Sequence, residues 1–313
     1  MKEKKNNIFI VLTVPVVIFL ILTACIDNYG FHSLKIVLSQ AIIPTTLGYA
    51  MCFTNAIGMF DLSCASAMII ASMIGGSLGN TMGIPGLIIG CIAVGVVLGV
   101  INGTVYKLLK IPCLIVSLGL LLIYEILAQK IGLGVSKTIP ADVGIIGKFP
   151  YSLIILGASA LLFYYIYNKT CIACHIRAVG NEELLANALG INAMNTKYMT
   201  FVLAGIFIGI GAVILLSRTM TASAMTASGT YSFDCMIACV LGGVFISGGG
   251  GKMYQAILGV LVINVMFNGL TCIGVSDYWQ MVVKGGVLFL AVGLEVLQRY
   301  FAGKQKEKVP VKA

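Results

Sequence analysis

The apolar segments of this sequence recur along nearly its whole length, and each is about as long as a helix that crosses a bilayer. Clear examples cover residues 8–26, 86–106 and 198–217. A helix needs roughly 20 apolar residues to span the hydrocarbon core, where every backbone polar group must be bonded within the segment. Charged residues make up only 10% of the chain, against roughly a quarter in soluble proteins. The sequence therefore predicts an integral membrane protein without a large soluble domain.

Glycine, proline, asparagine and charged residues divide these apolar segments into about ten expected helices. They cover residues 8–26, 36–56, 63–79, 86–106, 112–130, 151–167, 198–217, 231–247, 253–271 and 280–299. The predicted fold is all-α, a polytopic bundle that forms one transmembrane domain over residues 1–313. The first segment also has the pattern of a signal peptide that ends at Cys25, but an uncleaved first span has the same basic and then apolar order.

The distribution of lysine and arginine predicts the orientation of the bundle. With a cytoplasmic N-terminus, fourteen of these residues lie on the cytoplasmic side, five lie outside and Lys284 lies within a span. Positive residues concentrate in cytoplasmic segments, so we expect both termini to be cytoplasmic and the protein to be a multi-pass protein of the cytoplasmic membrane. The net charge of +9 then reflects orientation rather than nucleic-acid binding. The long loop 168–197 and the basic tail 300–313, which can contact lipid headgroups, are both expected in the cytoplasm.

The loop 168–197 opens with Cys171, Cys174 and His175 in the C-x-x-C-H spacing that attaches c-type haem. That attachment takes place outside the cytoplasmic membrane, whereas this segment is expected inside it. A structural zinc site needs four protein ligands, but no second pair of ligands lies near these three residues, and the other histidine, His32, is expected on the opposite side. The sequence therefore predicts no metal and no cofactor here.

The glycine-rich segment "SGGGGKM" resembles a phosphate-binding loop only superficially. The pattern G-x-x-x-x-G-K-[ST] fails because Ile246 occupies the first glycine position and Met253 the hydroxyl position. No catalytic cluster is visible elsewhere, so we expect no enzymatic activity in this chain. If ATP drives a process here, another subunit must bind it.

The second half of the same loop predicts a short amphipathic helix. Asn181 can cap it, and the carboxylates of Glu182 and Glu183 complement the positive end of its dipole. The apolar face would consist of Leu184, Leu185, Ala188 and Leu189, and Gly190 offers a left-handed stop. Such a helix is either an ordinary helix at the membrane interface or a projection that docks into a groove of a partner.

A few polar side chains are expected at membrane depth or close to it. A charge at the centre of a span costs about 2.5–3.5 kcal/mol, so such groups should be paired, near an end or beside water. Asp61 and Asp234 could cap helices or line a transport path. Asn102, Asn264 and Asn268 suit a polar translocation path, although hydrogen bonds between helices would use them equally well. The remaining ionisable residues of this kind are Glu125, Lys284 and Glu295.

Five blocks of sequence, in this order, resemble the membrane subunit of ribose-type monosaccharide ABC importers, within the branched-chain and ribose permease superfamily. They are "IGMFDLSCASAM" (57–68), "GVINGTVYKLLKIPCLIVSLG" (99–119), "AVGNEELLANALGIN" (178–192), "GTYSFDCMIACVLGGVFISGGGGKM" (229–253) and "NGLTCIGVSDYWQMVVKGGVLFLAV" (268–292). Together they cover roughly residues 36–295. Their joint order is far more specific than any single block.

The resemblance implies a permease without enzymatic activity that works as a pair, formed with a second copy or a paralogue. Its expected partners are two cytoplasmic ATP-binding subunits and an extracytoplasmic sugar-binding protein. The segment with Asn181, Glu182, Glu183, Leu184, Leu185, Ala188 and Gly190 matches the family's coupling segment, which docks on the ATPase. ATP-driven closure of the ATPases would then rock the bundle between outward and inward openings.

Three blocks depart from the family pattern, and these departures concern the substrate path more than the fold. The chain has "IGMFDLSCAS" for "GGIDLSVG", "CIACHIR" for a basic turn with glycine, and "GGVFISGG" for "GGTSLxGG". The alternative function is an ion-coupled secondary transporter, which would favour an acid paired with a base inside the membrane or repeated halves. A membrane-bound enzyme would need a convergent catalytic cluster.

Overall fold

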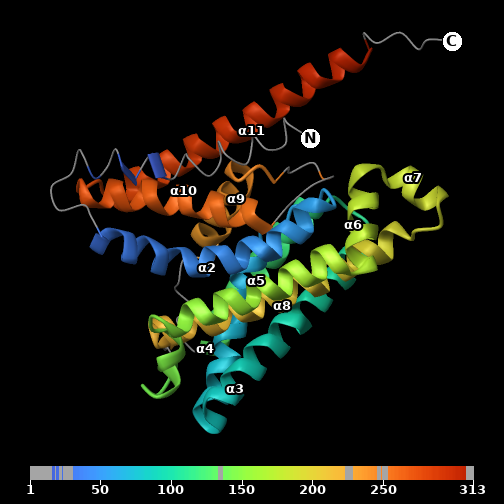
Figure 1. Cartoon of the computed structure of the whole chain (residues 1–313). Helices are drawn as coiled ribbons and strands as arrows, with labels where there is room; N and C mark the ends of the chain where they lie inside the picture. Colours follow the sequence, from blue (N-terminus) through green and yellow to red (C-terminus); the bar gives the residue numbers. More distant parts are fainter. Residues whose placement is uncertain are drawn as a thin grey trace.

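The computed structural model describes residues 16–17, 19–20, 23, 31–132, 137–222, 228–244, 248 and 253–307, and over these ranges the chain is almost entirely helical (Figure 1). The predicted first span, 8–26, lies mostly outside the described residues. The long helices are α2 (Phe31–Ala56), α3 (Cys64–Leu109), α4 (Cys113–Gly132), α5 (Tyr151–Lys169), α8 (Ala193–Thr219), α10 (Met253–Cys272) and α11 (Asp277–Glu307). The shorter elements are β1 (Lys137–Thr138), η1 (Val143–Gly147), α6 (Cys171–Asn181), α7 (Glu183–Ala188), β2 (Thr221–Ala222) and α9 (Ser228–Leu241).

Six of the described helices are long and apolar enough to cross a membrane. One of them, α3, is 46 residues long and contains two predicted spans, 63–79 and 86–106. The break between them is a kink at Gly83, whose φ is 69°, two residues before Pro85. Proline cannot donate the helical bond and clashes with the preceding turn, and glycine tolerates positive φ. The chain therefore reverses at the place where the sequence predicted a loop.

The predicted span 231–247 is wrong at both ends. The helix α9 begins at Ser228 and ends at Leu241, so it is 14 residues long. That corresponds to about 21 Å of helix, less than the roughly 30 Å of a hydrocarbon core. Gly243 follows with φ of 85°, a backbone conformation that ends the helix.

The second half of α3 packs closely on α8. Gly95 lies so close to α8 that a Cβ there would be 2.5 Å from the carbonyl oxygen of Gly205 and 2.7 Å from the amide of Gly209. A Cβ on Gly99 would similarly meet the carbonyl oxygen of Phe201 at 2.5 Å. Gly95 and Gly99 therefore allow α3 and α8 to approach closely, as small residues do between helices in membranes.

The helix ends gather into two opposite sets. At one end, here called the sheet end, β1 pairs antiparallel with β2, and Lys35 at the start of α2 lies over the ring of Phe149. At the other, the α7 end, α6 and α7 project together from the bundle, at the right of Figure 1. Lys107 at the end of α3 donates a 2.9 Å hydrogen bond to Asn195 at the start of α8, which also lies at the α7 end. Successive long helices thus run between the two ends, as spans of alternating direction require.

The segment 168–197 is more helical than a loop. It contains α6 and α7, and α8 begins at Ala193 rather than at the predicted residue 198. Likewise α11 continues to Glu307, so the first eight residues of the predicted tail 300–313 are helical.

Candidate functional site

The helix α7 is a six-residue helix held at the tip of a helical hairpin with α6. The hairpin packs on the bundle through α6, whose Ala173, Ile176 and Val179 are buried at intervals of three residues. Arg177 of α6 donates a 2.9 Å hydrogen bond to the carbonyl oxygen of Tyr167 in the last turns of α5. A cation there stabilises the end of a helix, where carbonyl groups lack helical partners. The base of the hairpin is therefore fixed to a long helix.

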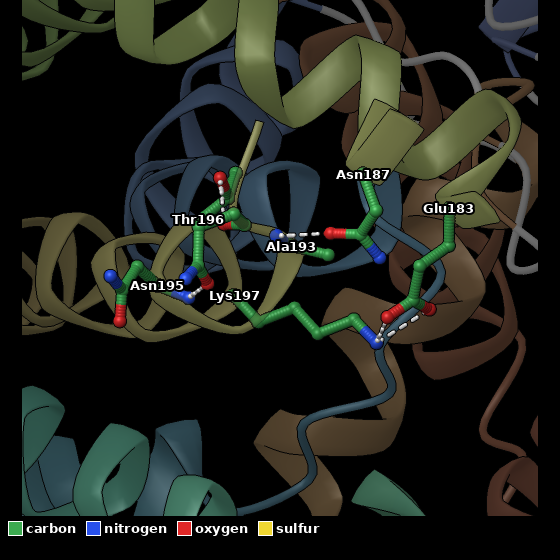
Figure 2. Close-up of polar contacts among 7 residues, drawn as sticks. Glu183, Asn187, Ala193, Asn195, Thr196 and Lys197 are labelled. Atoms are coloured by element: carbon green, nitrogen blue, oxygen red, sulfur yellow. Dashed lines mark hydrogen bonds and ion pairs between the residues drawn. The ribbon is translucent and has the colours of Figure 1, made fainter. Parts of the chain in front are cut away.

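Polar contacts fix α7 to the start of α8, as Figure 2 shows. Nζ of Lys197 lies 2.8 Å from each carboxylate oxygen of Glu183. The side-chain oxygen of Asn187 accepts a 3.1 Å hydrogen bond from the amide of Ala193, the first residue of α8. Asn192 caps α8 by accepting a 2.9 Å bond from the amide of Asn195. A displacement of α7 along the membrane normal would therefore act directly on α8.

The predicted apolar face of α7 points away from the protein. Leu184, Leu185 and Leu189 are 80%, 59% and 72% exposed, and Ala188 is exposed as well. The residue that α7 buries is Ala186, at 2% exposure. Three exposed leucines, two on this short helix and one directly after it, form an apolar surface that nothing in the described chain covers. This arrangement fits a projection that docks into a partner.

The prediction that Asn181 caps this helix is wrong. Asn181 is the last residue of α6, and the N-cap position of α7 is Glu182, whose side chain accepts no capping bond. The extended backbone of Glu182 separates the two helices. Gly190 does have a positive φ, 84°, as predicted for the residue that stops the helix.

The C-x-x-C-H residues lie on α6. Cys171, Cys174 and His175 are all exposed, and Nη2 of Arg177 lies 3.4 Å from Sγ of Cys174. Among the described residues, no group of three His, Cys, Asp or Glu side chains is arranged to hold a metal. The three residues stand at positions i, i+3 and i+4 of a helix, so they lie on one exposed face of α6.

Three glycines, Gly58, Gly180 and Gly248, allow three separate segments to approach closely near α7. A Cβ on Gly248, whose φ is 88°, would lie 2.7 Å from the carbonyl oxygen of Gly180 and 3.0 Å from the amide of Gly58. Gly248 thus allows the backbone to pass between α6 and the α2–α3 loop. A cavity of about 460 Å³ lies beside this contact, and Glu183 and Lys197 are among the residues that line it.

Asp61 and Asn102 belong to one buried network at the α7 end. Oδ1 of Asp61 accepts bonds from the amide and the hydroxyl of Ser63, at 2.9 and 2.6 Å. Nδ2 of Asn102 donates to the Ser63 hydroxyl at 2.8 Å, and the Tyr124 hydroxyl donates to Oδ1 of Asn102. Burial raises the pKa of the Asp61 carboxyl, while hydrogen bonds from Ser63 and Asn102 lower it. The network joins the α2–α3 loop, the second half of α3, and α4.

Asp234, Asn264 and Asn268 line a second site, near the sheet end. They border a cavity of about 220 Å³ between α2, α9, α10 and α11. Asp234 is not a helix cap: it lies inside α9 and forms an ion pair with Lys284 of α11 at 2.8 Å. The predicted path residues therefore separate into two groups, one at each end of the bundle.

A sequence profile described as "Branched-chain amino acid transport system / permease component" matches residues 33–292 of the chain. The chain belongs to this permease family. The match confirms the superfamily that the five blocks predicted, and this permease is a multi-pass protein of the cytoplasmic membrane. No solved structure matches the permease.

Curated relatives of the permease include several sugar transport components. The chain is 33% identical over 146 residues to the xylose transport system permease protein of Haemophilus influenzae, covering 47% of this chain and 39% of that protein. It is 36% identical over 146 residues to the ribose import permease protein of Bacillus subtilis, covering 47% and 45%. It is 35% identical over 151 residues to the L-arabinose transport system permease protein of Escherichia coli, covering 48% and 44%. The permease thus spans less than half the length of these relatives.

Proposed function

We propose that the permease is the membrane subunit of an ATP-binding cassette importer for a monosaccharide or a similar small polar solute. The observation that carries the proposal is α7, an exposed apolar helix fixed by side-chain contacts to the start of a long span. The family match and the sugar named in each relative support the solute class. In this proposal a partner subunit binds ATP, because Ile246 and Met253 break the phosphate-loop pattern of this chain.

In this proposal α7 is the coupling helix. The residues predicted from the sequence to contact the ATPase keep that role, except that Asn181 does not cap the helix. The leucine face, Leu184, Leu185 and Leu189, fills a groove of a cytoplasmic ATP-binding subunit. Closure of the ATPase pair pushes α7, and the Glu183–Lys197 ion pair transmits the push to α8. Since α8 packs on α3 through backbone contacts, the two helices move as one body and the bundle alternates between its two openings.

The translocation path uses the two polar groups in succession. Solute released by an extracytoplasmic binding protein first meets Asp234, Asn264 and Asn268 near the sheet end. It then passes toward the network of Asp61 and Asn102 at the α7 end. A second copy of the permease, or a paralogue, completes the path as its partner. In the same proposal, the whole chain 1–313 is one permease domain.

An ion-coupled transporter is the alternative function considered from the sequence, and one of its criteria is met. Asp234 and Lys284 are an acid and a base paired within helices. The criterion does not outweigh the family match, because a neutralised pair offers no open site for a coupling ion.

The orientation of the bundle can be tested with native thiols. Cys171 and Cys174 are exposed at the α7 end, and Cys272 is exposed near the sheet end. If the α7 end is cytoplasmic, a membrane-impermeant maleimide should label Cys171 and Cys174 only in inside-out vesicles and Cys272 only in right-side-out vesicles. Variants with serine at either site identify the labelled residue by mass spectrometry. The reverse pattern would contradict the orientation.

Co-purification tests the function itself. When the permease is expressed together with the ATP-binding subunit of its importer, we expect the pair to remain bound through affinity purification in mild detergent. A tagged permease that never retains an ATPase, although its own fold is intact by circular dichroism, would rule the proposal out.

A further inference from the structure

The cavity near the sheet end is lined by polar groups at membrane depth. Its side chains include a carboxylate (Asp234), an ammonium (Lys284), a hydroxyl (Thr271) and the amides of Asn264, Asn268 and Gln280. Asp234 and Lys284 lie six or seven residues from the sheet-end starts of α9 and α11. That is about 10 Å along each helix. Polar side chains at such a depth face a bundle interior or a water-filled cavity, because lipid cannot solvate them.

The ion pair uses only part of the acceptor capacity of the Asp234 carboxylate. Nζ of Lys284 donates a 2.8 Å bond to Oδ2 of Asp234 and is in ion-pair contact with Oδ1 at the same distance. Oδ1 is buried, and its polar contact is this ammonium group. A carboxylate can accept up to about four hydrogen bonds, so a ligand hydroxyl that reached Asp234 would add a charge-assisted hydrogen bond to the ion pair.

The lining also restricts what could occupy the cavity. Its one acid and one base neutralise each other, so neither a cation nor an anion finds an uncompensated partner. Its volume of about 220 Å³ is below the roughly 300–1,000 Å³ of sites for drug-sized ligands. Phe267 adds an apolar ring, over which Nζ of Lys284 lies 4.8 Å from the centroid. A small neutral molecule with several hydroxyl groups fits all of these features.

We propose that this cavity is a solute-binding site of the permease for a neutral polyhydroxylated molecule of monosaccharide size, in which Asp234 accepts a solute hydroxyl and Lys284 holds the carboxylate. The ion pair gives the site its selectivity: it rejects charged sugars because either charge would be left partly unpaired. The proposal rests on the proposed function for its biological solute, but it concerns binding by this chain alone.

A native cysteine allows binding to be measured directly on the permease. Sγ of Cys272 lies 4.0 Å from Oδ1 of Asn268, a residue that lines the cavity. In the purified permease in nanodiscs, saturating D-xylose, D-ribose, L-arabinose or D-galactose should slow alkylation of Cys272. Alkylation of Cys171 and Cys174, at the opposite end, is the internal control and should keep its rate. Slowing of all three thiols, or of none by any of the four sugars, would overturn the proposal.

Charge variants test the selectivity. In Asp234→Asn, protection of Cys272 by the neutral sugar should weaken about tenfold, and D-galacturonate should begin to protect, because Lys284 is then unpaired. In Lys284→Gln, D-glucosamine should protect instead. The double variant Asp234→Asn/Lys284→Gln is neutral again, so it should bind neither charged sugar. If a single variant does not fold, the double variant tests whether the ion pair is needed for the preference for neutral sugars. Unchanged sugar preference in folded variants would contradict the proposal.

The outcomes separate this inference from the proposed function. If the ATP-binding subunit is retained but no sugar protects Cys272, the cavity is a structural ion-pair site and the importer assignment stands. If Cys272 is protected but no ATPase is ever retained, the binding site stands and the importer assignment fails.

Discussion

Replacing both Leu184 and Leu185 with serine should abolish ATP-dependent uptake while leaving the permease folded. The two side chains are 80% and 59% exposed, so the isolated chain loses little packing when they are truncated. In a complex they would be the apolar anchors of the interface with the ATP-binding subunit. Truncation of such an anchor costs about 2 kcal/mol or more, so the affinity for the ATPase should fall at least about 30-fold. Retention during affinity purification and ATP-driven uptake both measure the loss.

The matched control is Leu108→Ser. Leu108 is 74% exposed and lies one residue before the end of α3, at the same end of the bundle. We expect this variant to retain the ATPase and to transport at nearly the rate of the unmodified permease. An equal loss of ATPase retention and uptake in both variants would mean that any exposed leucine at this end matters. It would then contradict the assignment of α7 as the specific contact with the ATPase. Full activity in the α7 variant would have the same consequence.

Replacing Gly95 with valine should prevent stable folding of the permease. Its Cβ would have to lie 2.5 Å from the carbonyl oxygen of Gly205, a backbone atom that cannot turn aside. The helices α3 and α8 would have to separate, and we expect a destabilisation of about 3 kcal/mol or more. Thermal unfolding in detergent and the yield of monodisperse protein are the measurements.

The control for this variant is Gly119→Val in α4, where a Cβ would meet no atom within 4 Å. Both substitutions place the same β-branched residue within an apolar helix, so their helix propensities change equally. We expect Gly119→Val to unfold close to the temperature of the unmodified permease. A small effect at Gly95, similar to that at Gly119, would show that the contact between α3 and α8 can relax.

Much of the fold could be predicted because single residues mark its boundaries. Gly83 and Pro85 divide α3 where two spans were expected, and Gly190 ends α7 with a positive φ. Hydrophobicity alone did not predict α6, because its buried Ala173 and Ile176 are interspersed with exposed cysteines and a histidine. Those two residues, with Val179, are buried at a helical interval and were the signal that could have identified it.

The parts that could not be predicted depend on contacts between distant residues. Asp234 and Lys284 are fifty residues apart, and their pairing follows from the way α11 packs beside α9. The same holds for Lys197, which contacts Glu183 only because α8 begins five residues earlier than expected. The contact of Gly248 with Gly180 and Gly58 also depends on where residue 248, α6 and the α2–α3 loop meet. A pattern along one segment carries no information on such pairs.

The most direct test of the account is solute uptake by proteoliposomes that contain the permease, its ATP-binding subunits and its solute-binding protein. With a radiolabelled monosaccharide outside and ATP inside, we expect uptake that stops when ATP is withheld and continues when proton and sodium gradients are dissipated. Uptake that follows an ion gradient and proceeds without ATP would contradict the account.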